Sequence, residues 1–191
     1  MMNSAKQLHD VDTAVQELLA EVKLLLLDVD GVLSDGKIVF TANGDEAKAF
    51  STLDGQGIKM LQRSGVLVGV ITGRKSALTE RRCRDLGINL LKQGREDKWT
   101  AFEELRNENA SIQNIQLSNI AYMGDDYPDL LVMSRIGLPC TPCNAVHALT
   151  QRAKVVTNRA GGEGAVREIC DLIMQSQGSY DAALQRYLPQ S

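Results

Sequence analysis

Long hydrophobic stretches are missing from this sequence of 191 residues. No apolar run approaches the ~20 residues that a membrane-spanning helix requires. Residues 1–12 also lack the basic and then apolar pattern of a secretory signal. These two absences predict a cytoplasmic protein that does not act on a membrane.

An excess of positive charge is missing as well, because the formal net charge is −3. Such a charge gives no general attraction to nucleic acid or to an anionic membrane. Apolar residues at 43% and charged residues at 24% are ordinary for a globular protein. The length suits one domain with a sizeable core and is too short for two full domains. We therefore expect a single domain over residues 1–191 that acts on a small molecule.

Cysteine and histidine patterns typical of metal sites are also absent. The sequence has four cysteines, and only Cys140 and Cys143 have a spacing suited to metal or redox chemistry. No second pair accompanies them, and neither of the two histidines has a recognised spacing from them. We interpret the cysteines as scattered reduced thiols, and Pro139 and Pro142 predict a strand-to-helix loop at the pair.

What the sequence does contain is an apolar run, Leu24 to Leu27, that ends abruptly in the carboxylates Asp28 and Asp30. Four leucines without alternation are typical of a strand buried on both faces. Side chains two apart on an extended chain share a side, so both carboxylates can approach one cation or one substrate. A plain turn formed by Asp and Gly31 is the alternative interpretation.

Helical and extended patterns alternate along the chain and predict an α/β fold. Helices are expected near 12–22, 54–64, 77–86, 97–107, 128–134, 144–152 and 165–175, and strands near 24–27, 66–71, 87–91, 119–123 and 154–157. This alternation favours a doubly wound, Rossmann-like parallel sheet flanked by helices, with right-handed crossovers.

Two segments do not follow that alternation. Residues 37–51 contain Asn43-Gly44 between extended stretches, which predicts an inserted β-hairpin. We expect it to be a flap beside the site, and an edge hairpin or an oligomer contact would have the same pattern. Residues 178–191 form a C-terminal tail that is either loose or an arm docking on a neighbour.

Four polar clusters fall at comparable places in the predicted fold. They are Asp28 with Asp30, Thr72 with Gly73, Lys98 at a helix start, and Asp125 with Asp126 and Asp129. Carboxylates gathered at one sheet edge favour a hard cation, and Mg²⁺ is the usual one where phosphate is bound. A carboxylate nucleophile, charge neutralisation and a second carboxyl as general acid and base are the requirements of phosphoryl transfer.

The stretches Asp28-Val-Asp-Gly-Val32, Ile71-Thr-Gly-Arg74 and Gly124-Asp-Asp-Tyr-Pro-Asp129, with Lys98 between the last two, resemble the four ordered motifs of the haloacid dehalogenase superfamily phosphatases. The resemblance implies that Asp28 is the nucleophile and a Mg²⁺ ligand. It makes Asp30 the general acid and base, with its backbone carbonyl on the metal, and Asp125 the third protein ligand.

The same resemblance assigns the other motif residues. Thr72 and the backbone N–H of Gly73 would hold the phosphoryl oxygens, and Lys98 would steady the nucleophile and the transferring group. Asp126 and Asp129 would support the metal site and Lys98. For these last two residues, a charge that complements a helix dipole is the alternative.

More narrowly, the hairpin, residues 51–57 and the segment 161–168 resemble the family of 3-deoxy-D-manno-octulosonate 8-phosphate phosphatases. That family is capless and homotetrameric, and it serves lipopolysaccharide precursor biosynthesis. A sugar-acid phosphate is then the expected small-molecule partner, with Arg74 as the best candidate for its carboxylate. The further expected substrate contacts are Lys59, Arg82, Ser51, Thr52, Asp54 and Gly55.

Alternatives remain open at this stage. The motifs do not separate the eight-carbon acid from another sugar acid, such as a nonulosonate 9-phosphate. A non-catalytic tetramerisation module would not need Asp28, Asp30, Thr72, Lys98 and Asp125 together. A phosphorylated receiver domain lacks a role for the acid that follows the acceptor.

Overall fold

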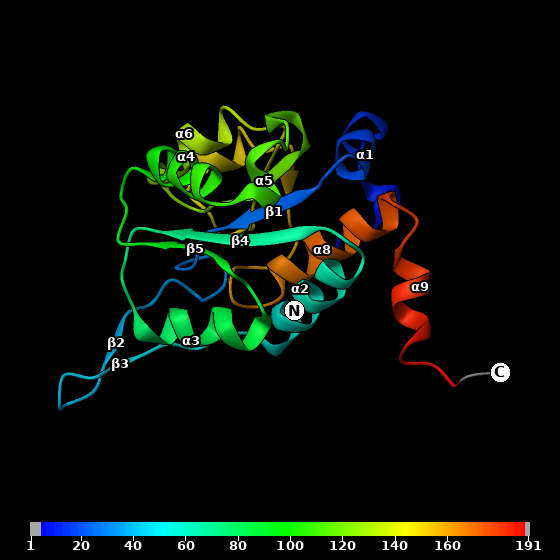
Figure 1. Cartoon of the computed structure of the whole chain (residues 1–191). Helices are drawn as coiled ribbons and strands as arrows, with labels where there is room; N and C mark the ends of the chain where they lie inside the picture. The colour runs from blue at the N-terminus through cyan, green and yellow to red at the C-terminus, as the bar shows by residue number, and fades with distance from the viewer. Residues whose placement is uncertain (1–4, 190–191) are drawn as a thin grey trace.

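The computed structural model of the protein describes residues 5–189. Its centre is a six-stranded parallel sheet with the order β5-β4-β1-β6-β7-β8 (Figure 1). The strands are β1 (Leu24–Leu27), β4 (Leu67–Thr72), β5 (Leu90–Gln93), β6 (Ile120–Met123), β7 (Leu138–Thr141) and β8 (Val155–Val156). This order confirms the doubly wound α/β fold. Strands β4 and β5 are added on one side of β1, and strands β6, β7 and β8 on the other. The strand order therefore reverses between β1 and β6, which is the switch point where open sheets bind ligands.

The leucine run forms the middle of the sheet because it is apolar on both faces. Leu24 pairs with Leu67 on one side and with Ile120 on the other. All four leucines of β1 are fully buried. Leu25 and Leu27 belong to one hydrophobic core, and Leu24 and Leu26 belong to the core on the opposite face. The run is therefore the shared wall of two cores, as expected for a parallel strand.

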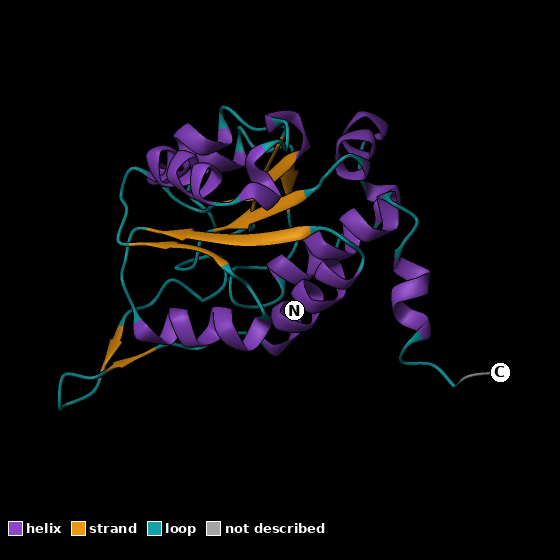
Figure 2. Ribbon diagram, in the orientation of Figure 1, coloured by secondary structure: helices purple, strands orange, loops and turns teal. Residues whose placement is uncertain are grey.

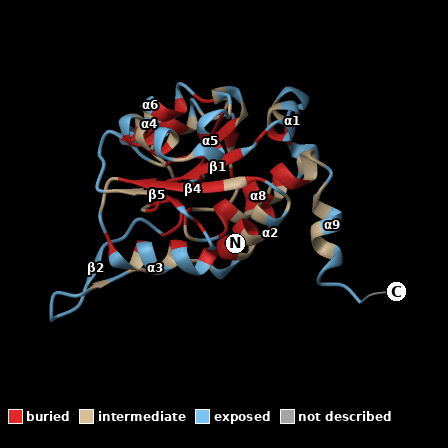
Figure 3. Ribbon diagram, in the orientation of Figure 1, coloured by how far each residue is buried: buried red, intermediate tan, exposed pale blue. Residues whose placement is uncertain are grey.

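Helices cover both faces of the sheet (Figures 2 and 3). The core on one face receives side chains from α1 (Thr13–Ala20), α2 (Thr52–Arg63), α3 (Ala77–Leu86) and α8 (Ala165–Ser176). The core on the other face receives side chains from α4 (Lys98–Glu108), α5 (Ala110–Gln113), α6 (Leu130–Met133) and α7 (His147–Thr150). Within residues 5–189, every helix is too short or too polar to span a bilayer.

The predicted hairpin is present, but its strands are short. It consists of β2 (Val39–Phe40) and β3 (Glu46–Ala47), joined by a turn with Gly44 at a φ of 85°. A two-stranded ribbon has no third strand to extend its pairing, so only its middle is regular. The hairpin projects from the body beside the end of α3 (Figure 1).

Two predictions around the later strands were imprecise. Pro139 does not begin a loop, because it lies within β7 opposite Tyr122. A proline lacks only the N–H, and the Pro139 carbonyl still accepts a hydrogen bond from the Lys154 N–H at 2.8 Å. The helix predicted at 128–134 is split into a 3₁₀ turn, η3 (Tyr127–Asp129), followed by α6.

The cysteines are free thiols. Cys83, Cys140 and Cys170 are buried, and Cys143 is exposed. Burial raises the pKa of the Cys83 thiol to about 11, which keeps it protonated.

The tail forms α9 (Tyr180–Gln185), which contacts its own chain. The Tyr187 hydroxyl accepts hydrogen bonds from Gln56 Nε2 at 2.5 Å and from Arg63 Nη1 at 3.0 Å. These contacts place the tail along α2, at the opposite end of the molecule from the hairpin (Figure 1). Of the predicted tail, residues 190 and 191 lie outside the described residues.

Asp54 joins the two most closely packed helices. It lies in the first turn of α2, is 1% exposed, and accepts a hydrogen bond from the Arg167 N–H of α8 at 2.8 Å. Burial raises the pKa of Asp54 to about 6, against the lowering effect of the Arg167 and Gly164 N–H groups. Asp54 therefore supplies the N-terminal cap that α8 lacks in its own sequence.

We predict that Asp54→Ala lowers the free energy of unfolding by about 2 kcal/mol, because α8 loses its cap and buried donors lose an acceptor. The midpoint of thermal unfolding should fall by roughly 4–8 °C. Asp54→Asn keeps one acceptor oxygen and should lose less. Equal midpoints for Asp54→Ala and the wild-type protein would contradict the capping role.

Candidate active site

A cavity opens at the carboxyl edge of the sheet, over the switch point between β1 and β6. Its lining brings together all four polar clusters that the sequence singles out, and comprises Asp28, Asp30, Gly36, Thr72, Gly73, Arg74, Glu96, Lys98, Asp125, Asp126, Pro128 and Asp129. Thr72 is the last residue of β4, and Asp125 is the second residue after β6. The parallel sheet places these groups together because all its strands end at this edge.

The loops after β1 and β6 approach each other very closely. The Asp28 N–H continues the sheet by donating to the Met123 carbonyl at 3.0 Å. Gly31 then turns the chain with a φ of 89°, and a Cβ atom there would lie 2.0 Å from Asp125 Oδ2. Glycine is therefore the residue that lets the Asp125 carboxylate lie beside this turn.

A second glycine supports the same loop from the other side. A Cβ atom on Gly161 would lie 1.7 Å from the Gly31 carbonyl oxygen. The Gly161 N–H donates to Asn144 Oδ1 at 3.0 Å, and the Gly162 N–H donates to the Val32 carbonyl at 2.9 Å. The glycine-rich segment thus holds the loop after Asp28 in place.

Lys98 is the positive centre of the site. It begins α4, which Asp97 caps by accepting a hydrogen bond from the Thr100 N–H. Its side chain is 4% exposed, and Nζ lies 2.8 Å from Asp28 Oδ2 and 2.6 Å from Asp129 Oδ1. Burial by itself would lower the pKa of Lys98, but the Asp28 and Asp129 carboxylates outweigh it and raise the pKa. The ammonium therefore stays charged between the two carboxylates.

Asp129 is fully enclosed by hydrogen-bond donors. Besides Lys98, it accepts bonds from the Tyr122 hydroxyl at 2.5 Å and from the N–H groups of Asp125 at 3.0 Å and Asp126 at 3.2 Å. Burial and the Asp129 charge raise the pKa of Tyr122 well above its usual value, so it remains a donor. Tyr122 was not among the predicted site residues, because in sequence it is one apolar position of β6.

The other two carboxylates are crowded and have fewer donors, with Lys98 on Asp28 Oδ2. Oxygens of Asp28, Asp125 and Asp129 lie within 4.8 Å of one another. Burial raises the pKa of Asp28 to about 6, opposed by Lys98. Burial also raises the pKa of Asp125 to about 7, with the Asp28 and Asp129 charges adding to the effect. Among the described residues, nothing donates a hydrogen bond to the buried Asp28 Oδ1.

This arrangement fits a hard divalent cation. Mg²⁺ takes oxygen ligands from one or two carboxylates, and a cation favours the charged form of carboxyl groups that burial and mutual repulsion disfavour. Asp28 and Asp125 have oxygens free to bind it, whereas both oxygens of Asp129 already accept hydrogen bonds. The residues present are therefore suited to a Mg²⁺ site.

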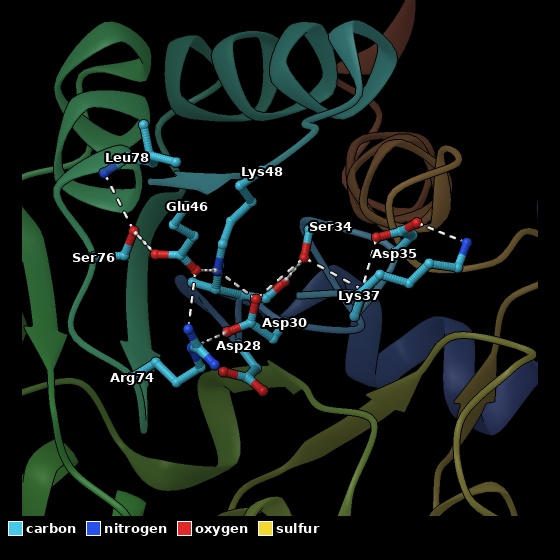
Figure 4. Close-up of polar contacts among 12 residues, drawn as sticks. Asp28, Asp30, Ser34, Asp35, Lys37, Glu46, Lys48, Arg74, Ser76 and Leu78 are labelled. Carbon is cyan, nitrogen blue, oxygen red and sulfur yellow. Dashed lines mark hydrogen bonds and ion pairs between the residues drawn. The ribbon is translucent and has the colours of Figure 1, made fainter. Parts of the chain in front are cut away.

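The Asp30 carboxylate does not join the cluster of Asp28, Asp125 and Asp129. The prediction that side-chain alternation brings the carboxylates of Asp28 and Asp30 to one cation was therefore wrong. The strand ends at Leu27 and the chain turns from residue 30 onward, so the rule for extended chains no longer applies. Asp30 instead pairs with Lys48 at the base of the hairpin and lies 3.9 Å from Arg74 Nε (Figure 4). It still lines the cavity.

Most of the expected sugar contacts lie elsewhere. Of that set only Arg74 lines the cavity, and Ser51, Thr52, Asp54, Gly55, Lys59 and Arg82 do not. Ser51 caps α2, and its carbonyl accepts a bond from Arg82 Nη2 at 2.8 Å. Gly55 packs against Arg82, while Lys59 lines a separate surface cavity with Arg84.

Glu46 and Lys48 are polar residues that the sequence analysis missed. Their signal in the sequence is the alternation of large residues with alanine over 46–50, and in the structure positions 46, 48 and 50 are partly buried while 47 and 49 are exposed. A hairpin strand with charged residues on its inner side indicates a polar partner on the body of the protein.

Comparison with known proteins agrees with this geometry. A scan against models of protein families gives no match. The chain is 47% identical to the 3-deoxy-D-manno-octulosonate 8-phosphate phosphatase KdsC of Salmonella typhi over 173 residues, which cover 91% of this chain and 90% of that protein. It is 48% identical to the KdsC protein of Escherichia coli K12 over 162 residues, 85% of this chain and 84% of that protein.

Solved structures give the same result. A probable YrbI family phosphatase from Pseudomonas syringae superposes with a TM-score of 0.89 at 44% identity, covering 94% of this chain and all of that one. The 3-deoxy-D-manno-octulosonate 8-phosphate phosphatase of Moraxella catarrhalis, in complex with magnesium, phosphate and KDO, superposes with a TM-score of 0.87 at 38% identity over 92% of this chain and 98% of that one. The chain therefore belongs to the 3-deoxy-D-manno-octulosonate 8-phosphate phosphatase family of the haloacid dehalogenase superfamily.

Proposed function

We propose that this protein is a Mg²⁺-dependent phosphomonoesterase that hydrolyses 3-deoxy-D-manno-octulosonate 8-phosphate to the sugar acid and phosphate, a step of lipopolysaccharide precursor biosynthesis. The observation that carries the proposal is the meeting of Asp28, Asp125, Thr72 and Lys98 in one cavity at the switch point. The curated relatives and the KDO-bound neighbour support the choice of substrate.

In this proposal Asp28, Asp125 and the Asp30 backbone carbonyl hold Mg²⁺. The ion supplies charge neutralisation at the phosphoryl oxygens when bound. Asp129 acts indirectly, since its hydrogen bonds fix Lys98, Tyr122 and the loop that carries Asp125. Asp126 supports the same loop from its exposed side.

The first chemical step transfers the phosphoryl group to the protein. An Asp28 carboxylate oxygen forms a bond to phosphorus as the bond from phosphorus to the sugar oxygen breaks. Asp30 gives its proton to that departing oxygen. Lys98 holds Asp28 in position, and Thr72 with the Gly73 N–H holds the phosphoryl oxygens.

The second step restores the enzyme. A water molecule attacks phosphorus, Asp30 takes a proton from that water, and the bond from Asp28 to phosphorus breaks. Phosphate leaves, and both carboxylates regain their starting states. In this proposal Arg74 binds the substrate carboxylate with its planar guanidinium, and its position in the cavity lining, 3.9 Å from Asp30, supports that role.

We predict that phosphate release depends on Mg²⁺ and strongly prefers the eight-carbon acid phosphate over other sugar-acid phosphates and simple phosphate monoesters. The test measures phosphate from such a panel, with Mg²⁺ and with a chelator. A preference for a nonulosonate 9-phosphate would keep the chemistry and change the substrate. No release from any ester would favour a non-catalytic tetramerisation module.

The matched control for that panel is Asp28→Asn. It keeps the shape of the side chain but removes the nucleophile, so turnover should fall by at least ~10³-fold while circular dichroism stays unchanged. Full turnover in this variant would contradict the role of Asp28.

A homotetramer in the cytoplasm forms part of the proposal. The hairpin supports assembly, because Ile38, Val39 and Phe40 are 49%, 52% and 65% exposed and make its first strand an apolar surface. We predict that Phe40→Asp lowers the molar mass found by light scattering from four chains to fewer. An unchanged tetramer in that variant would show that this strand makes no essential contact.

We predict that Asp125→Asn stabilises the metal-free protein at pH 8. The folded-state pKa of Asp125, about 7, lies above the ordinary value of 3.8, so its contribution to stability is lost as the pH rises between these values. The midpoint of thermal unfolding should rise by roughly 2–4 °C for each kcal/mol by which the substitution relieves the cost of a buried charge near Asp28 and Asp129.

The gain from Asp125→Asn should shrink from pH 8 to pH 5, where the wild-type carboxyl is protonated. Calorimetry at both pH values, with and without Mg²⁺, measures it. Mg²⁺ should stabilise the wild-type protein more than the variant. An equal loss of stability in Asp125→Asn at both pH values would contradict the assignment.

A further inference from the structure

Four charged side chains of alternating sign form a closed ring at the base of the hairpin (Figure 4). Glu46 Oε1 lies 3.0 Å from Arg74 Nη2, and Arg74 Nε lies 3.9 Å from Asp30 Oδ2. Asp30 Oδ1 pairs with Lys48 Nζ, which lies 4.0 Å from Glu46 Oε1. Ser76 Oγ also donates to Glu46 Oε2 at 3.2 Å. We call these four residues, Asp30, Glu46, Lys48 and Arg74, the hairpin ring.

Lys48 is the most enclosed member of the hairpin ring. Its side chain is 2% exposed, compared with 21% for Asp30, 20% for Glu46 and 39% for Arg74. Taking an ammonium out of water is unfavourable, and a buried one is retained where carboxylates compensate its charge. Phe50 on the same side of the strand already packs against the core, so anchoring the hairpin does not require a buried charge.

Lys48 contacts the Asp30 carboxylate, whose orientation decides whether it can give a proton to the leaving oxygen. Asp30 Oδ1 meets Lys48 and the Ser34 hydroxyl, the latter at 3.4 Å, while Oδ2 faces Arg74. Lys48 lies eighteen residues after Asp30 in the sequence. It belongs to the inserted segment 37–51 that forms the hairpin. The hairpin thus supplies a direct partner of Asp30, which lines the cavity.

We propose that Lys48 is a positioning residue that holds the Asp30 carboxyl in line with the oxygen of the leaving group. The inference rests on the proposed function, in which Asp30 gives its proton to that oxygen as the bond from phosphorus to oxygen breaks and the bond from Asp28 to phosphorus forms. Proton transfer requires a heavy-atom distance of about 2.6–3.2 Å, so a free rotamer of Asp30 loses it. Lys48 itself contacts neither the phosphorus nor the leaving oxygen.

The test is Lys48→Met, which keeps the length and the apolar stem of the side chain but removes the ammonium. Its kcat/KM is measured with Mg²⁺ on two esters of similar shape, phenyl phosphate and 4-nitrophenyl phosphate. The phenolate needs a proton to leave, whereas 4-nitrophenolate leaves readily without one. Since kcat/KM covers only the steps up to departure of the alcohol, the later role of Asp30 as a base does not enter.

We expect kcat/KM of Lys48→Met to fall on the order of 10- to 100-fold for phenyl phosphate. The fall for 4-nitrophenyl phosphate should be less than about threefold. Equal falls for both esters would mean that Lys48 only supports the structure, and no fall for either would mean that it has no role. Both outcomes overturn the proposal. A wild-type protein that releases no phosphate even from 3-deoxy-D-manno-octulosonate 8-phosphate would instead refute the proposed function itself.

Lys37→Met is the matched control. Lys37 is also a lysine of the hairpin segment paired with an aspartate, at 3.0 Å from Asp35 Oδ2, but its side chain is 77% exposed and outside the hairpin ring. Its ratio of the two kcat/KM values should equal the wild-type ratio. If Lys48→Met does not fold, Lys48→Gln tests the same ratio with a neutral side chain, and an unchanged ratio in a folded Lys48→Gln variant overturns the proposal.

Discussion

Three carboxylates cannot share the end of one sheet without a positive charge among them, and Lys98 supplies it here. Its ammonium lies between Asp28 and Asp129, and the Asp125 carboxylate completes the cluster. Burial, with the neighbouring carboxylate charges adding to it, raises the pKa values of Asp28 and Asp125 even in the presence of Lys98. A cation site in a folded protein has this character, because the groups that bind the cation repel one another before it arrives.

The rest of the molecule serves to keep these groups together. Two cores on opposite faces fix β1, which delivers Asp28 to the switch point. Gly31 and Gly161 let neighbouring loops approach at distances that a Cβ atom would forbid. Tyr122, buried below the edge, donates to Asp129 and so fixes a carboxylate that a solvent-exposed loop would leave free to rotate.

The two motif carboxylates two residues apart belong to different surroundings. Asp28 faces Lys98 and the acidic cluster, whereas Asp30 faces the hairpin ring. This separation lets one carboxylate attack while the other handles a proton, since each is governed by its own neighbours. It also explains why a hairpin of a few paired residues is inserted directly after them.

The amino-acid sequence by itself determined the α/β class, five of the six strands of the sheet and the four polar clusters, because local periodicity and strand-end positions depend on neighbouring residues. It did not predict β7. It did not reveal that Asp54 caps α8, that Pro139 lies within a strand, or that Lys48 meets Asp30. Each of these contacts joins residues that are far apart in the sequence. Asp54 and Arg167 are 113 positions apart, the paired strand residues Tyr122 and Pro139 are 17 apart, and Asp30 and Lys48 are 18 apart. Only tertiary packing decides such partners, since a buried polar group takes whichever donor or acceptor the fold brings to it.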